Sequence, residues 1–275
     1  MLKRIVFAVT VITLTLSGCS DFQRIQKKGN YDEKYEAALR YYDDNDWYRA
    51  SVLLESIVPL TKGKKEAEEV QLKYAYCQYN QREYYLATYY FKKFYETFPR
   101  NEYTEESMYM SAISLARISP IYELDQTNTY KAINALQGFI NKFPETKYMA
   151  ECNAKIDEFQ RKLEKKAYET AKLQFKIGHH RAAVISFDNF STDYPDSPYN
   201  EELAYLKIEA QYLFGKNSIQ KVKKDGKTIY LKRDRLEEAQ NYYFAFIDKY
   251  QSSKLLKDAE TVYRNTQNEL LELEN

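Results

Sequence analysis

Glycine is scarce in this sequence, with 7 residues in 275, and no two of them stand closer than eleven positions. A phosphate-binding loop or a dinucleotide-binding fingerprint needs glycines within about five positions of each other, so both are excluded. Two histidines and three cysteines, with no Cys-x-x-Cys or Cys/His spacing, leave little material for a metal site or a nucleophile–base pair. The sequence therefore predicts a protein that is not an enzyme and needs no metal or cofactor.

An excess of charge of one sign is also missing. The chain has 41 basic and 40 acidic residues. Removal of residues 1–18 would take away Lys3 and Arg4 and no acid, leaving 39 basic against 40 acidic residues. Without a strong positive field, the mature protein is not expected to bind nucleic acid.

Long apolar runs are absent except at the N-terminus. Lys3 and Arg4 precede an uncharged run from Ile5 to Leu16, which is typical of a secretory signal and too short for a permanent membrane span. Leu16-Ser17-Gly18-Cys19 then resembles the lipobox of bacterial lipoproteins. We expect residues 1–18 to be removed, Cys19 to carry lipid that binds the membrane, and residues 19–30 to form a tether. The alternative is an ordinary cleaved signal followed by a chance cysteine.

The remaining cysteines and the two histidines are expected to have structural roles only. Cys77 and Cys152 fall in separate predicted helices and are expected to be small buried residues; a disulfide between them is the alternative. His179 and His180 follow Gly178 in a predicted turn, where exposed turn residues are favoured over metal ligands.

A repeat becomes visible when alanines are aligned. Each of five alanines is followed by large apolar or aromatic residues at positions +4 and +7, the spacing of one helix face, and these alanines are Ala50, Ala87, Ala132, Ala183 and Ala239. Each has a second alanine upstream: Ala38, Ala75, Ala112, Ala171 and Ala210. Paired small residues let two antiparallel helices approach closely. The sequence predicts an all-α fold, an α-solenoid of about five helical hairpins.

Proline marks the end of three of these hairpins. Pro99, Pro144 and Pro195 follow an aromatic residue at a fixed distance from the alanine, and each is expected to stop a helix. The repeat resembles the tetratricopeptide repeat. It has paired small residues and, counted from the second alanine, a large residue at +4 and a proline at +12, although the early tryptophan of the tetratricopeptide repeat is missing.

Two segments depart from the repeat, a long predicted helix that separates two lobes and an insertion in unit 5. No Gly or Pro occurs between Thr146 and Ile177, which predicts one long helix of about 45 Å. We expect an N-terminal lobe of units 1–3 over residues 31–145, and a second lobe over 146–275 that holds this helix and units 4–5. Unit 5 carries a basic insertion over 216–235, in which Asp225-Gly226 would close a hairpin between Val222 and Ile229. The insertion is either a solvated loop or a basic finger that contacts a partner through Lys221, Lys223, Lys224 and Lys227.

The first helices of the N-terminal hairpins are expected to line a groove. Counting from the alanine of each first helix gives an aromatic-rich set with a polar fringe: Tyr35, Leu39, Tyr42, Leu72, Tyr76, Tyr79, Asn80, Tyr109, Ile113 and Arg117. Tyrosine offers a large rigid face and a hydroxyl that can bond a peptide backbone, which suits capture of extended segments. The alternative is that most tyrosines only pack helix on helix.

These features together resemble the BamD family, the lipoproteins of the outer-membrane β-barrel assembly machinery. The resemblance covers roughly Cys19 to Leu273. It implies a lipid-anchored protein at the outer membrane that faces the periplasm. It also implies that C-terminal units dock on a POTRA domain of the barrel protein BamA, while the N-terminal groove receives unfolded barrel proteins through aromatic-ending C-terminal signals. The basic insertion has no counterpart in this resemblance.

Two other functions fit parts of the pattern. A periplasmic tetratricopeptide lipoprotein that scaffolds envelope or peptidoglycan enzymes would share the fold and lack affinity for unfolded barrel chains. Solute-capturing lipoproteins of uptake complexes are usually longer and richer in tryptophan, and Trp47 is the single tryptophan here.

Overall fold

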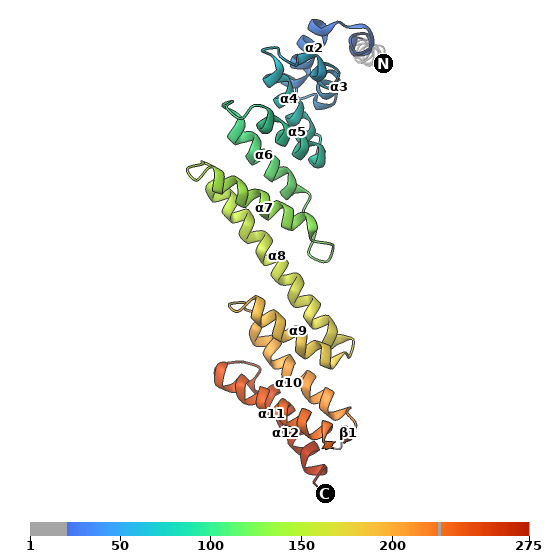
Figure 1. Cartoon of the computed structure of the whole chain (residues 1–275), viewed down its shortest axis with the longest axis vertical. Helices are drawn as coiled ribbons and strands as arrows, with labels where there is room; N and C mark the ends of the chain where they lie inside the picture. The colour runs from blue at the N-terminus through green and yellow to red at the C-terminus, as the bar shows by residue number, and fades with distance from the viewer. Residues whose placement is uncertain (1–20, 225–226, 275) are drawn as a thin grey trace, which may run out of the picture. The chain divides into compact units, whose positions relative to one another are not determined.

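The computed structural model describes residues 21–224 and 227–274. The chain divides into two compact units, Met1–Phe159 and Gln160–Asn275. Helices follow one another along the chain in both units (Figure 1). The all-α repeat architecture predicted from the alanine frame is confirmed, with one short two-stranded hairpin added.

Three helical hairpins build the first unit. Their helices, with a 3-10 turn η1 after the first hairpin, are α2 (Tyr31–Asp43), α3 (Trp47–Ile57), η1 (Val58–Thr61), α4 (Ala67–Asn80), α5 (Tyr84–Thr97), α6 (Thr104–Arg117) and α7 (Thr127–Lys142). Each packs on the next in sequence, from α2 on α3 through to α6 on α7. The first half of α8 (Met149–Lys176) closes this unit, because Cys152, Ile156 and Phe159 join the core of the third hairpin.

The repeating alanines form the contact between the two helices of each hairpin. In the first two hairpins, Ala38, Ala50, Ala75 and Ala87 are completely buried. In α5 the aromatic residues at +4 and +7, Phe91 and Phe94, are completely buried as well, and together with Ala75 and Ala87 they form the core of the second hairpin.

The ends of the helices follow the predicted signals. Helix α5 ends at Thr97, just before Phe98 and Pro99, and α7 ends at Lys142 before the next aromatic-proline pair. Residues with a left-handed backbone conformation form the tight turns between the two helices of three hairpins. They are Asn45 with φ 58°, Arg82 with φ 65° and Gly178 with φ 80°. All three stand five positions before the alanine of the second helix, so they are equivalent positions of the repeat.

The second unit contains two hairpins and a closing helix. Its helices are the second half of α8, α9 (His180–Asp193), α10 (Asn200–Lys216), α11 (Leu231–Lys249) and α12 (Leu256–Glu272). Helix α8 has 28 residues, about 42 Å at 1.5 Å per residue, as expected for the long helix. The boundary between the units lies inside it, at 159/160, because each half packs on its own hairpins; the sequence placed the boundary at 145/146.

Helix α12 was not predicted from the repeat frame. It packs on α10 and α11 and buries Ala259, Val262 and Thr266, one face of a helix, against the last hairpin. It thereby covers an apolar surface of the hairpin formed by α10 and α11.

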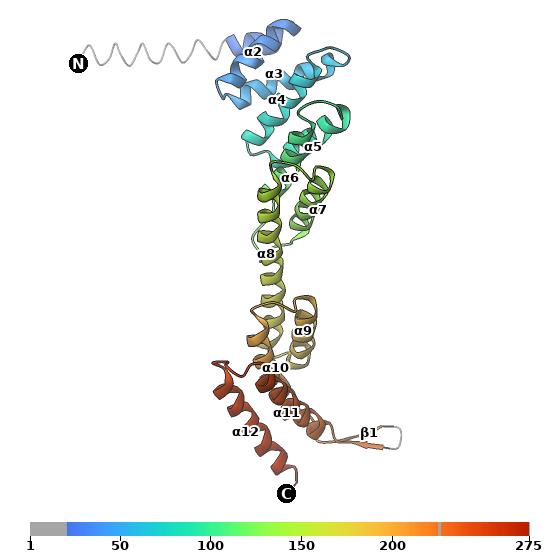
Figure 2. The same ribbon diagram turned by 90° about the vertical axis from the view of Figure 1, so that its left-hand side faces the viewer.

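The basic insertion forms the predicted hairpin. Strand β1 (Val222–Lys224) pairs antiparallel with β2 (Lys227–Ile229), with Val222 opposite Ile229 (Figure 2). The turn type at residues 225–226 lies outside the described residues.

Part of the segment expected to be a tether is helical and packs on the first hairpin. Residues 21–28 are helical, and Phe22 and Ile25 are buried in the core of the first hairpin. The Phe22 ring meets Tyr41 edge to face at 5.7 Å, and Arg49 lies 5.6 Å from its centroid. Cys19, the expected lipidation site, lies outside the described residues.

Cys77 and Cys152 are free and buried, as predicted from their positions in separate helices. Burial raises the pKa of the Cys77 thiol to about 12 and that of the Cys152 thiol to about 11. Both therefore stay protonated near neutral pH and act as packing residues.

Candidate functional site

A cleft of about 460 Å³ opens between helices α2, α4 and α6 of the first unit. Its walls include Tyr42, Leu72 and Tyr76, three of the residues predicted to line a groove. We call this cleft the acidic groove because four glutamates and two lysines line it: Glu68, Glu69, Glu102, Glu106, Lys65 and Lys73.

The other predicted groove residues lie elsewhere. Tyr35, Leu39 and Tyr79 are half-buried, and Asn80 and Arg117 are exposed, but none of the five is part of the wall of the acidic groove.

The prediction that Tyr109 and Ile113 line the groove is wrong, because both are core residues. Only 6% of Tyr109 and 7% of Ile113 are exposed, and both belong to the apolar core of the third hairpin. The Tyr109 ring stacks on the Tyr148 ring, with centroids 3.8 Å apart. Leu72 is also 9% exposed, so it forms the floor of the groove.

The tyrosine hydroxyls are engaged within the protein. Tyr35 donates a hydrogen bond of 2.6 Å to Glu69, and Tyr76 donates to Glu106, so each bond links the first helix of one hairpin to the first helix of the next. Burial and these carboxylates raise the pKa of both phenols. The expectation that these hydroxyls are free to bond a peptide backbone is therefore wrong for Tyr35 and Tyr76, whose rings remain the available surface.

Lys73 links the aromatic and acidic parts of the groove. Its ammonium lies 4.1 Å from the centroid of Tyr42 and 3.8 Å from Glu69. Burial raises the pKa of the Tyr42 phenol to about 12, so the groove offers neutral aromatic faces at physiological pH.

The loop before α6 contributes groove residues that the sequence did not reveal. Tyr103 is 43% exposed at the groove, and Asn101 donates a 2.6 Å hydrogen bond to Glu68 across it. Counting positions in the first helices could not find them, because they precede the helix. The only sequence signal was an aromatic residue among polar ones in a turn.

Charge restricts what the acidic groove can bind. Carboxylates accept hydrogen bonds from peptide N–H groups and attract cations, and they repel another carboxylate. The groove therefore suits the middle of an extended chain, or a basic segment, better than a chain's terminal carboxylate.

The basic insertion borders a second cleft, in the second unit. Lys221 is exposed and lines a space of about 470 Å³ together with Tyr230, Arg233 and Leu273. The side chains of Lys223, Lys224 and Lys227 lie outside the described part of the structure. In residues 21–224 and 227–274, no three His, Cys, Asp or Glu side chains gather in a way that would hold a metal ion.

Comparison with known proteins identifies the family. A sequence profile of the YfiO family, described as an outer membrane lipoprotein, matches residues 27–228, well over half of the chain. The chain belongs to this family. The resemblance to BamD is thereby confirmed, since several relatives of this chain carry that name.

Two of these relatives show how far the similarity extends. The outer membrane protein assembly factor BamD of Rickettsia prowazekii (strain Madrid E) is 23% identical over 220 residues, which cover 78% of this chain and 86% of the relative. The protein of the same name from Pasteurella multocida (strain Pm70) is 21% identical over 214 residues, covering 73% of this chain and 82% of the relative. No helix in the described part of this YfiO-family chain is both long and apolar enough to cross a membrane.

Proposed function

We propose that this YfiO-family chain is a non-enzymatic lipoprotein component of the outer-membrane β-barrel assembly machinery. The observation that carries the proposal is the similarity, over most of the chain, to relatives named outer membrane protein assembly factors. Lipid on Cys19 would hold it on the periplasmic side of the outer membrane.

Unfolded barrel proteins are the proposed ligands of the acidic groove. The rings of Tyr42, Tyr76 and Tyr103 supply apolar area at low entropic cost. Glu68 and Glu102 on the rim can accept backbone N–H groups of an extended chain, independently of its sequence. This arrangement favours binding of many chains with modest affinity.

Docking on a BamA-like protein, through its POTRA domain, is assigned to the second unit. The basic insertion extends as a hairpin from this unit, and Lys221 at its base is exposed beside a cleft. A negatively charged partner surface would be attracted there, with salt-dependent association.

Affinity purification of the lipidated full-length chain from gently solubilised membranes tests the assembly role. Recovery of a POTRA-containing barrel protein in near-equal amount, together with loss of folded barrel proteins when the chain is depleted, is the expected result. Recovery of cell-wall enzymes, with barrel proteins at normal levels after depletion, would establish the scaffold function in place of assembly.

The groove assignment has its own test. Replacement of Tyr103 by Ser should weaken binding of an unfolded barrel segment with an amidated C-terminus, because it removes an exposed aromatic wall. Stability should change by less than about 0.5 kcal/mol, since the side chain is exposed and Ser is a good helix N-cap. Tyr48→Ser is the control, because Tyr48 is also exposed, at 65% against 43% for Tyr103, and lies in the same unit outside the groove. Equal affinities for both variants would remove the groove assignment.

A further inference from the structure

The helix over residues 21–28 gives the expected lipid anchor a short connection to the first unit. Cys19 stands two positions before Asp21, and two extended residues span at most about 7 Å. Phe22 and Ile25 are only 8% and 3% exposed on the first hairpin, so this helix is part of the folded unit. Lipid on Cys19 would therefore bring the first hairpin directly to the membrane surface.

The turn that follows this helix fixes it against α2. Gly29 ends the helix, and a Cβ atom at this position would lie 2.5 Å from the carbonyl oxygen of Ile25. Asn30 then begins α2 with a capping box. Its side chain accepts a hydrogen bond from the Glu33 amide, and its own amide donates to the Glu33 carboxylate. Local contacts therefore determine which face of the helix points away from the protein.

The outward face of this helix carries unpaired positive charge. Its exposed residues are Asp21, Gln23, Arg24, Gln26, Lys27 and Lys28. Arg24 offsets two acids, because its guanidinium lies 3.0 Å from Asp21 and 3.7 Å from Glu33. Lys27 and Lys28 make no ion pair within residues 21–224 and 227–274. Two free ammonium groups therefore remain at the end of the helix.

A second basic segment reaches the same place. Lys62 and Lys64 are exposed in the loop between η1 and α4, and neither makes an ion pair in the described part of the chain. The Lys64 ammonium lies 3.6 Å from the centroid of the Tyr31 ring, and Tyr31 follows Lys28 by three residues. We call the four lysines beside the start of α2 the anchor patch: Lys27, Lys28, Lys62 and Lys64. Asp32 is exposed next to Tyr31 and offsets part of this charge.

We propose that the anchor patch lies on the membrane that holds the lipid of Cys19, with its ammonium groups against anionic phospholipid headgroups. The short connection and a helix of about 12 Å keep the patch within about 20 Å of the lipidated residue. Lysines near an anchor are attracted by anionic headgroups, and acyl chains and basic residues act together in membrane binding. The patch would set which side of the first unit faces the membrane, which acyl chains alone cannot do. The position of the anchor rests on the proposed lipidation of Cys19, whereas the affinity of the patch for anionic membranes does not.

Vesicle co-sedimentation of the chain from residue 19 onward, with Cys19→Ser so that no lipid is attached, tests this inference. Vesicles that mix phosphatidylglycerol with phosphatidylcholine should bind the chain at least tenfold more tightly than vesicles of phosphatidylcholine alone, and high salt should abolish the difference. Lys27→Gln combined with Lys28→Gln should weaken binding to the mixed vesicles by tenfold or more, since each lysine near an anionic surface contributes roughly fivefold. Both side chains are exposed, so this variant should remain folded.

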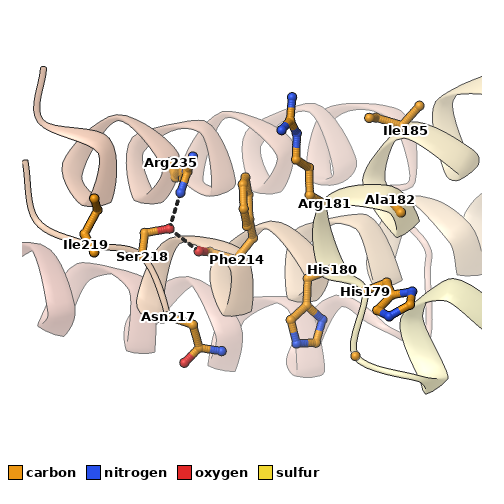
Figure 3. A pocket seen from close by; sticks show the side chains of 11 residues that line it. His179, His180, Arg181, Ala182, Ile185, Phe214, Asn217, Ser218, Ile219 and Arg235 are labelled. Carbon is orange, nitrogen blue, oxygen red and sulfur yellow. Dashed lines mark hydrogen bonds between the residues drawn. The ribbon is translucent and has the colours of Figure 1, made fainter. Parts of the chain in front are cut away.

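Controls separate the patch from nonspecific attraction. Lys92→Gln combined with Lys93→Gln removes the same charge from exposed positions of α5, in the second hairpin of the same unit, and should leave binding unchanged. Arg181→Gln tests the other unit. There Arg181 and Arg235 line a cleft of about 670 Å³, with the Phe214 ring between them (Figure 3), and the variant should also bind as the parent does.

Equal binding to the two kinds of vesicle would overturn the inference. A Lys27→Gln, Lys28→Gln variant that binds as tightly as the α5 control would overturn it as well. Mass spectrometry of Cys19, in protein isolated from membranes, tests the lipid separately. An unmodified Cys19 would remove the proposed anchor without changing the vesicle result, so the two ideas can fail independently.

Discussion

The hydrogen bond from Tyr76 to Glu106 offers a direct test of how adjacent hairpins are held together. Replacing Tyr76 with Phe removes only the hydroxyl. The ring remains, and it packs edge to face on Phe91 with centroids 4.9 Å apart. The change therefore isolates a polar link between α4 and α6 from the apolar contact beneath it.

The expected loss of unfolding free energy is about 1 to 1.5 kcal/mol. A hydrogen bond to a charged acceptor contributes roughly 1.5–3 kcal/mol when it is buried. Glu106 is only half-buried at the groove, so water can replace part of the lost bond, and the expected loss lies at or slightly below the lower end of this range. Truncation to Ala would also delete the ring and should cost about 3 kcal/mol.

Urea unfolding followed by the fluorescence of Trp47 measures this loss. The single tryptophan lies in the first unit and packs edge to face on Tyr42, with ring centroids 5.2 Å apart. A double-mutant cycle with Glu106→Gln should give a coupling energy near 1 kcal/mol. Tyr103→Phe, whose ring is exposed in the same unit, should shift the transition by less than about 0.5 kcal/mol. A coupling below about 0.3 kcal/mol would refute the argument that this bond stabilises the stack.

Three shorter predictions concern the first unit. Arg82→Gly should stabilise it by about 0.5–1 kcal/mol in urea unfolding, because Arg82 has φ 65°, and a loss of stability would contradict this reading of the turn. The Cys77 thiol should stay unreactive to a disulfide reagent at pH 8 until the protein unfolds. Since burial raises its pKa from 9.0 to about 12, its contribution to stability is complete below pH 9 and is lost as the pH rises toward 12; rapid native labelling would disprove its burial. Phe91→Ala should cost about 3–5 kcal/mol by the same urea assay, because the ring is fully buried, and a cost below about 1 kcal/mol would contradict its place in the core.

Much of the fold was predictable because one physical constraint recurs. Two helices can approach closely only where small residues face each other, so each hairpin was expected to have an alanine in both of its helices. Ala75 and Ala87 are completely buried, as that reasoning requires. The proline stops and the hairpin at Val222 follow from equally local chemistry. Helix α12 has no partner in the repeat frame, so aligning repeats could not reveal it.

The binding surface was less predictable, because position in a repeat does not determine exposure. Tyr35 and Tyr109 both stand three positions before the alanine of a first helix, yet Tyr35 is half-buried and Tyr109 lies in a core. What decides between them is the neighbouring hairpin: Tyr109 is covered by Tyr148, which precedes the long helix. That contact depends on how the chain enters α8, which repeat spacing does not encode.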